Sequence, residues 1–159
     1  MKKFELTSEF ITNIFGTKLF RIKALIEFGN VKAGELGGFV EKEENLNHEG
    51  NAWVYGNAEV YGDARVYGNA SVYGNACVCG DARVCGNADY ATVHGFGSEY
   101  RTTTFFKTKA GEIGVRCGCF YGNLSEFRKK VVETHGETKK AKEYLMLADL
   151  MEFRFSDNS

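Results

Sequence analysis

The sequence predicts a mainly β protein whose central part is a parallel β-helix of six-residue repeats. Two residue types lead to this fold class, because each returns at every sixth position. The valines are Val54, Val60, Val66, Val72, Val78 and Val84, and the alanines are Ala52, Ala58, Ala64, Ala70, Ala76, Ala82 and Ala88. The 159 residues also include 19 glycines and no proline, which indicates regular tight corners and not a disordered chain.

Each repeat predicts one short strand followed by a corner. Alanine and the valine two positions later point to the same side of a strand, so both side chains face the interior. The residues between and after them face outward, and a Gly-Asn or Gly-Asp pair forms the corner because these residues tolerate positive φ. Three such sides make a coil of 18 residues, which should stack Arg65 on Arg83 and Asp63 on Asp81.

Outward side chains of the repeats leave two interpretations open. The arginine pair is either a solvated ladder or a site for an anion or a partner. Tyrosines at equivalent outward positions either cover the coil or form the interface of a homodimer or homotrimer. These interface candidates are Tyr55, Tyr61, Tyr67 and Tyr73.

Three regions are expected along the chain: an N-terminal β cap with irregular first turns over residues 1–49, the repeats over 50–91, and a C-terminal α+β module over 92–159. The cap covers the open end of the β-helix, and its segment at residues 19–46 should form a hairpin or strand pair that leads into the first turns. Val54 follows Leu46 by eight positions instead of six, which predicts a two-residue insertion between them.

The C-terminal module is predicted to contain two strands followed by two helices. The strands are Thr102–Thr108 and Ile113–Phe120, joined by a Lys-Ala-Gly-Glu turn. Asn123 and Glu126 have the spacing of a capping box at the start of the first helix. The second helix is expected over Lys139–Met151, with small and apolar residues on one face.

The segment RIKALIEFGNVKAGELGGFVEKEENLNHEGNAWVYGNA resembles a group of phage and prophage hexapeptide-repeat proteins, which are often described as transferases or polymer-forming cytoskeletal proteins. TTTFFKTKAGEIGVRCGCFYGNLSEF, followed by ETHGETKKAKEYLMLADL, resembles a tail common on such proteins in Firmicutes and their phages. The resemblance implies a left-handed β-helix and a phage or prophage origin. It implies no established activity.

Charge and hydropathy exclude several classes of function. The net charge of −1 indicates neither the basic face of a nucleic-acid binder nor the acidic surface of a DNA mimic. No apolar run is long enough to span a membrane, and the N-terminal residues do not resemble a signal peptide. We therefore expect a cytoplasmic protein whose five cysteines are reduced.

Histidines and cysteines offer weak candidates for chemistry. Acyltransferases with hexapeptide repeats use a histidine as general base, and His48 and His94 flank the repeats without lying in them. Cys117 and Cys119 share one strand face, and His94 and His135 could complete a zinc site. Half-buried thiols that pack under the helices are the favoured interpretation, so no metal or cofactor is expected.

A threonine-rich segment beside the last repeats predicts a cleft for an anionic ligand or a partner, because arginines and hydroxyls are the usual donors to phosphate. The alternative is a strand with one solvated face. Arg101 and Arg116 are expected at the surface. The candidate binding residues are Ser98, Arg101, Thr102, Thr103, Thr104, Lys107, Arg116 and Phe120.

The sequence therefore predicts a non-enzymatic, homo-oligomeric binding protein that acts by occlusion or sequestration. In a phage context the candidate partners are host defence components, such as a CRISPR effector, or a small anionic signal such as a nucleotide. Two alternatives remain open at this point: an acyltransferase of the hexapeptide class and a self-assembling structural protein.

Overall fold

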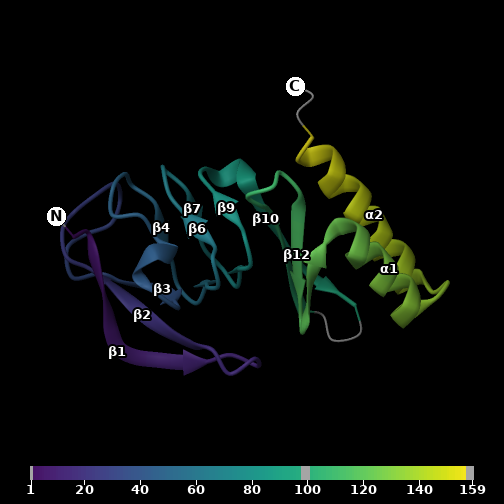
Figure 1. Cartoon of the computed structure of the whole chain (residues 1–159), viewed down its shortest axis with the longest axis horizontal. Coiled ribbons are helices and arrows are strands. Elements are labelled where there is room, and N and C mark those ends of the chain that lie inside the picture. The colour runs from purple at the N-terminus through teal and green to yellow at the C-terminus, as the bar shows by residue number, and fades with distance from the viewer. Residues whose placement is uncertain (1, 98–100, 157–159) are drawn as a thin grey trace.

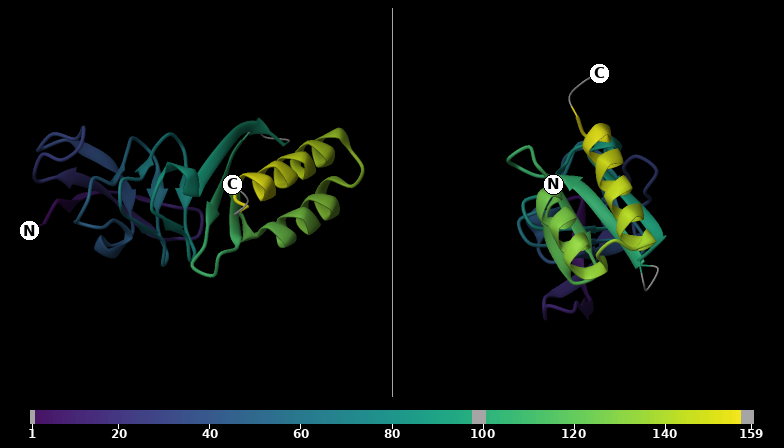
Figure 2. Two further views of the ribbon diagram at one scale, coloured as in Figure 1. Left: turned by 90° about the horizontal axis from the view of Figure 1, so that it is seen from above. Right: turned by 90° about the vertical axis from the view of Figure 1, so that its right-hand side faces the viewer.

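Four β-sheets and two α-helices make up residues 2–97 and 101–156, the part of the chain that this computed structural model describes (Figure 1). The largest sheet has the strand order β1-β2-β3-β5-β8, and a second has the order β10-β11-β12-β13. Two small sheets pair β4 with β7 and β6 with β9. The N-terminus and the helices lie at opposite ends of the molecule, with the repeats and the second sheet between them, and the β1–β2 hairpin runs along one side of the repeats (Figures 1 and 2).

The N-terminal region forms an antiparallel hairpin of β1 (Phe4–Thr12) and β2 (Lys18–Ala24). Strand β3 (Leu36–Val40) pairs antiparallel with β2 and parallel with β5. A short 3-10 helix, η1 (Glu43–Asn45), leads into the repeats. The strand pair expected within residues 19–46 is confirmed by β2 and β3, whereas β1 was not predicted.

Residues 50–88, called the repeat segment below, contribute six strands of two residues each. Parallel pairs join residues 18 positions apart, as the spacing predicted for Arg65 and Arg83. All six valines and six of the seven alanines are at most 1% exposed, whereas Ala88 is exposed in a second 3-10 helix, η2 (Asn87–Asp89). The strands are β4 (Trp53–Val54), β5 (Glu59–Val60), β6 (Arg65–Val66), β7 (Ser71–Val72), β8 (Cys77–Val78) and β9 (Arg83–Val84).

The two-residue insertion before the repeats is also confirmed. Val40 pairs with Val60, and Leu46 forms an isolated bridge with Val66, so both partners are 20 positions apart. This separation is two residues more than the 18 positions that separate paired strands within the repeats, as the eight-residue step from Leu46 to Val54 required.

The predicted fold class, a mainly β protein built on a left-handed parallel β-helix, is wrong. The chain is a mixed α/β protein, and its longest strands pair antiparallel, with nine residues in β1 and seven each in β2, β10 and β11. No closed helix of strands forms within the residues described. The repeats are too few: at 18 residues a level they supply little more than two levels, so antiparallel hairpins and helices make up the rest of the fold.

The C-terminal module contains four strands and two helices, so the prediction of two strands was incomplete. The expected strand at Thr102–Thr108 and both helices are present within a few residues. β10 was missed, and the expected strand Ile113–Phe120 is divided by a turn at Gly118, where φ is +58°. The elements are β10 (Tyr90–Phe96), β11 (Arg101–Lys107), β12 (Ile113–Cys117), β13 (Phe120–Asn123), α1 (Leu124–His135) and α2 (Lys139–Arg154).

The predicted capping box at the start of α1 is confirmed. The Asn123 side chain accepts a hydrogen bond from the Glu126 amide at 2.8 Å, and the Glu126 side chain accepts one from the Asn123 amide at 2.9 Å. Thr138 caps α2 in a similar way through the amide of Ala141. Neither helix, over the residues described, is both long and apolar enough to cross a membrane.

The central strands of the second sheet, β11 and β12, are buried on both faces, and adjacent residues of β11 pack into two different cores. Phe106 belongs to the apolar core of the repeat segment, whereas Phe105 packs with Phe127 and Tyr144 of the two helices. Both β11 phenylalanines are fully buried. The sheet therefore lies as a middle layer between the repeat segment and the helices (Figure 2).

The assignment of inward and outward positions in the repeats predicts a large loss of stability for one substitution and a small effect for a substitution at the adjacent residue. Val66→Asp should lower the free energy of unfolding by several kcal/mol, because it places an unpaired charge at a fully buried position. Arg65→Asp changes an exposed position and should shift it by less than about 0.5 kcal/mol. Urea denaturation of both variants measures the difference, and equal effects would show that this assignment is wrong.

Candidate functional site

Arg116 on β12 is a buried arginine between the second sheet and the repeat segment. Its pairing with Thr104 of β11 places it on the sheet face that meets the repeats. Its Nε donates a 2.8 Å hydrogen bond to the Tyr61 hydroxyl, and its guanidinium carbon lies 4.9 Å from the ring centre of Phe15 at the hairpin tip. The side chain is only 7% exposed, so the expectation of a surface arginine at this position was wrong.

A cavity of about 300 Å³ adjoins this guanidinium. Among the residues described, the Nη atoms of Arg116 have no hydrogen-bond partner, so they are free to donate into that cavity. Hydrogen bonds from an arginine to a carboxylate or phosphate group are charge-assisted and are among the strongest in proteins. The cavity is lined by Cys77, Arg101, Thr102, Arg116 and Gly118.

The surroundings keep Arg116 charged. Burial lowers its pKa, but the hydrogen bond from its Nε to Tyr61, with further contributions from Tyr61, Cys77 and Cys79, outweighs burial and raises it. Burial in turn raises the pKa of the Tyr61 hydroxyl well above its ordinary value, so this hydroxyl stays neutral. A cation held by a neutral acceptor retains its full charge for a ligand.

Cys77 lines the cavity from the repeat segment, and Glu59 is its neighbour there. The two residues are paired in register between β5 and β8, and the Cys77 thiol lies 3.8 Å from a carboxylate oxygen of Glu59. Burial, followed by the Glu59 charge, raises the pKa of Cys77 to about 12. The thiol is therefore protonated at neutral pH and is a poor nucleophile.

The fold divides the residues that the sequence suggested for binding. Thr102, Thr104 and Arg116 lie on the face toward the repeats, where the Thr104 hydroxyl accepts a 3.0 Å hydrogen bond from the Cys77 amide. Thr103 and Phe120 are directed toward the helices, and Thr103 donates to the Cys117 sulfur at 3.1 Å.

The remaining candidates are spread more widely. Arg101 lines the Arg116 cavity and also a second cavity of about 240 Å³ beneath the helices, together with Phe120. Lys107 forms an ion pair with Asp89 at 3.6 Å, away from both cavities. Ser98 lies outside the described residues. Binding by this set stays a prediction, which the geometry narrows to Arg101, Thr102 and Arg116.

The 18-residue spacing predicts Cys79 beside Tyr61, and the structure confirms this neighbour. The same spacing places Cys77 beside Glu59, a contact that sequence reasoning missed although it could have been found in this way. No sequence signal indicated that the tip of the β1–β2 hairpin, with Phe15, returns to Arg116. That contact depends on how far the hairpin extends along the repeat segment (Figure 1).

The four repeat tyrosines do not share one environment. Tyr61 is 9% exposed and bonded to Arg116, whereas Tyr73 is 60% exposed and meets the edge of Tyr90 at 6.5 Å. Tyr55 and Tyr67 are half-buried. Tyr61 is therefore unsuited to contact another protomer, and an interface through the other three stays a prediction.

The histidine contacts do not favour acyl transfer. His48 stacks on Phe4; its Nδ1 accepts a hydrogen bond from the Lys3 amide at 3.0 Å, and its Nε2 lies 2.9 Å from Glu43. With both nitrogens engaged, His48 has no lone pair for a substrate. His94 is exposed and lies 2.9 Å from the Thr102 hydroxyl, outside the lining of the Arg116 cavity.

The cysteines are all free thiols. Cys117, Cys119 and His135 line the cavity beneath the helices together with Tyr144, whose hydroxyl is 3.8 Å from the Cys117 sulfur. Within the described ranges, no three or more His, Cys, Asp or Glu side chains are arranged to hold a metal ion.

Comparisons with known proteins leave the family open. No protein-family model matches the chain, and a search of the curated proteins finds no similar sequence.

The hydrogen bond from Arg116 to Tyr61 should be measurable as stability. Tyr61→Phe leaves the buried Nε without its acceptor and should cost roughly 1–3 kcal/mol in chemical denaturation. Tyr73→Phe is the matched control, because that ring is mostly exposed and its substitution should cost close to nothing. Equal losses in the two variants would contradict the contact.

Thiol reactivity should separate the cysteines of the native protein. Cys85 and Cys119 are exposed and should react readily with Ellman's reagent at pH 8. Burial raises the pKa of Cys77 to about 12 and that of Cys79 to about 11, so these two thiols should react only after unfolding. Rapid native labelling of either one, located by peptide mass mapping, would show that the wall of the site is open.

Proposed function

We propose that this chain is a non-enzymatic binding protein that holds a small anionic ligand in the cavity beside Arg116. The oxyanion of the ligand lies against the Nη atoms of Arg116, and Arg101 and the Thr102 hydroxyl complete the site. The observation that carries the proposal is a 7% exposed arginine that lines a cavity, with its Nε held by Tyr61 and its Nη atoms without a hydrogen-bond partner among the described residues.

Electrostatics favours an anion at this position. Buried charges are usually paired, because removing an ion from water costs several kcal/mol. The carboxylate of Glu59 is close enough for the charge of Arg116 to lower its pKa, but burial has the larger effect and raises that pKa, and the Cys77 thiol is its hydrogen-bond partner. No ion pair joins Glu59 to Arg116 among the described residues, so an oxyanion that enters the cavity would supply a direct hydrogen-bond partner to a guanidinium already held in place.

Binding without catalysis is the better-supported reading of this geometry. The nearest thiol is protonated, the nearest phenol is neutral, and neither flanking histidine lines the cavity. An acyltransferase would need a general base beside its substrate. The hexapeptide acyltransferase alternative is therefore less well supported than sequestration of a ligand.

The biological setting that we propose comes from the sequence resemblance. A phage or prophage protein of this kind would act in the host cytoplasm and would sequester an anionic host metabolite or signal, or occlude a defence component that presents one. The buried arginine is compatible with such a role, because its recognition of an oxyanion requires no reaction.

Inorganic phosphate is the probe that tests the proposal. Titration followed by amide NMR should shift the resonances of Thr102 and Gly118, and Arg116→Gln should weaken that binding at least 10-fold. Because Arg116→Gln removes a buried hydrogen bond and can lower stability, Arg101→Gln provides a second test, with a similar loss of affinity expected.

Arg128→Gln is the matched control for charge. Arg128 pairs with Asp149 and Glu152 on the surface of the helices, at 2.9 Å in each case, and does not line the cavity. Its substitution should leave phosphate binding unchanged. Absence of shifts at Thr102 and Gly118 in the wild-type protein, or full binding in both Arg116→Gln and Arg101→Gln, would overturn the proposed function.

A further inference from the structure

Arg65 and Arg83 are stacked in register on a different face of the repeat segment. The parallel pair of β6 and β9 places each arginine directly opposite the other. Directly opposed like charges destabilise a sheet, and an intramolecular acid or a bound anion would relieve their repulsion.

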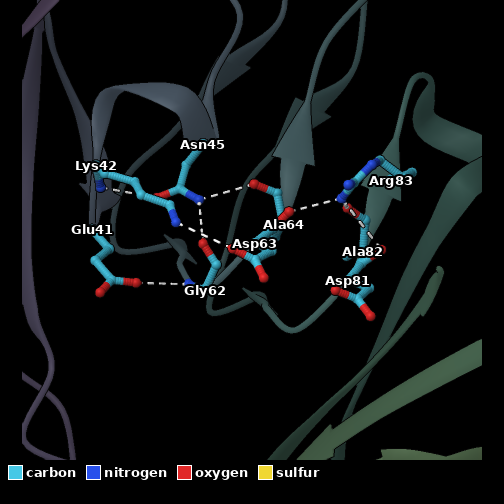
Figure 3. A network of polar contacts seen from close by, with 9 residues as sticks. All are labelled: Glu41, Lys42, Asn45, Gly62, Asp63, Ala64, Asp81, Ala82 and Arg83. Atoms are coloured by element: carbon cyan, nitrogen blue, oxygen red, sulfur yellow. Dashed lines mark hydrogen bonds and ion pairs between the residues drawn. The ribbon is translucent and has the colours of Figure 1, made fainter. Parts of the chain in front are cut away.

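Intramolecular acids do not neutralise this pair. The Nη1 of Arg83 donates to three backbone carbonyl oxygens, those of Asp63, Asp81 and Ala82, at 2.7, 3.4 and 2.9 Å (Figure 3). The nearby Asp63 carboxylate is instead 3.3 Å from Lys42. Within the part of the chain described, neither Arg65 nor Arg83 forms an ion pair with a carboxylate.

The corner that holds Arg83 is well ordered by hydrogen bonds. Asn45 donates to the Gly62 and Ala64 carbonyl oxygens at 3.2 and 2.9 Å, and the Gly62 amide donates to Glu41 at 2.8 Å (Figure 3). Arg83 is thereby fixed against the backbone, while Arg65 is exposed. One fixed and one adjustable guanidinium can hold an oxyanion from two sides.

A groove of about 990 Å³ runs beside the two arginines. Half-buried Tyr67, two residues after Arg65 on the same side of the chain, contributes an aromatic ring to its lining. Three acids also line the groove, from η1 and the loop that follows it, and one of them, Glu43, is already paired with Lys2 and His48. The arginines come from β6 and β9, whereas the acids come from η1 and the loop after it. The side of the groove that is formed by the arginines is therefore cationic, and it lies beside the ring of Tyr67.

We propose that this groove is a second ligand site, independent of the Arg116 cavity, for a small molecule that carries an oxyanion on an aromatic ring. The oxyanion binds between Arg65 and Arg83, and the ring packs against Tyr67. Aromatic rings in contact contribute about 0.5–1.5 kcal/mol beyond the burial of their area. A groove of this volume is within the range that accommodates such ligands.

Phenyl phosphate, benzoate and inorganic phosphate are the probes, titrated into the full chain and followed by the amide resonances of Tyr67 and Cys85. Phenyl phosphate or benzoate should bind, and the tighter of the two identifies the oxyanion as phosphate or carboxylate. Arg65→Gln should weaken that binding at least 10-fold. Because Arg65 is exposed and its side chain forms no hydrogen bond or ion pair among the residues described, this variant should fold normally.

Two further variants make the assignment specific. Tyr67→Leu should weaken phenyl phosphate severalfold while leaving inorganic phosphate unchanged, because only the ring loses its contact. Arg116→Gln should leave binding in the groove intact, which separates this site from the proposed function. Wild-type affinity of the aromatic probes in Arg65→Gln, or their loss in Arg116→Gln alone, would overturn the inference.

Discussion

Burial of the central strands of the second sheet, β11 and β12, on both faces is the constraint on which the rest of the molecule depends. Strand β11 sends Phe106 into the core of the repeats and Phe105 into the core beneath the helices, so the two cores are joined through one layer. The edge of the repeats is closed at the same place, where the Cys77 amide donates to the Thr104 hydroxyl and Ala82 bridges Thr108. Without this layer, the last repeat strands would expose unpaired backbone groups, which favours aggregation.

The same layer explains why a charged residue is buried here. A sheet whose two faces are covered has little room for a side chain that needs water, yet β12 carries Arg116 on the face toward the repeats. The Tyr61 hydroxyl and the ring of Phe15 accommodate the guanidinium, one by a hydrogen bond and the other by a cation–π contact. Three regions far apart in sequence therefore meet at one arginine, and the cavity beside it exists because none of them fills the space completely.

Local patterns in the sequence predicted the elements much better than they predicted the fold class. The alternation of alanine and valine fixed which repeat residues are buried, and the spacing from Leu46 to Val54 revealed the insertion, because both depend only on neighbouring residues. The fold class failed since it was extrapolated from the repeats to the whole chain. Strand β10 was missed because Tyr90–Phe96 has weak alternation, and its pairing with β11 is decided by tertiary contacts.

The site was predictable only in part, for a related reason. A threonine- and arginine-rich segment indicates donors to an anion, but it does not show which residues of a strand share a face with which neighbouring element. Adjacent Thr103 and Thr104 are both buried, one toward the helices and the other toward the repeats. A strand with one solvated face, the simplest reading of such a segment, would have exposed one of them. The pairing of Arg65 with Arg83 was the opposite case: their 18-residue separation was sufficient to place them together, because the repeat itself sets their register. Neighbouring side chains within a repeat can therefore be deduced from spacing, whereas a cluster formed between a repeat and a different part of the fold requires the structure.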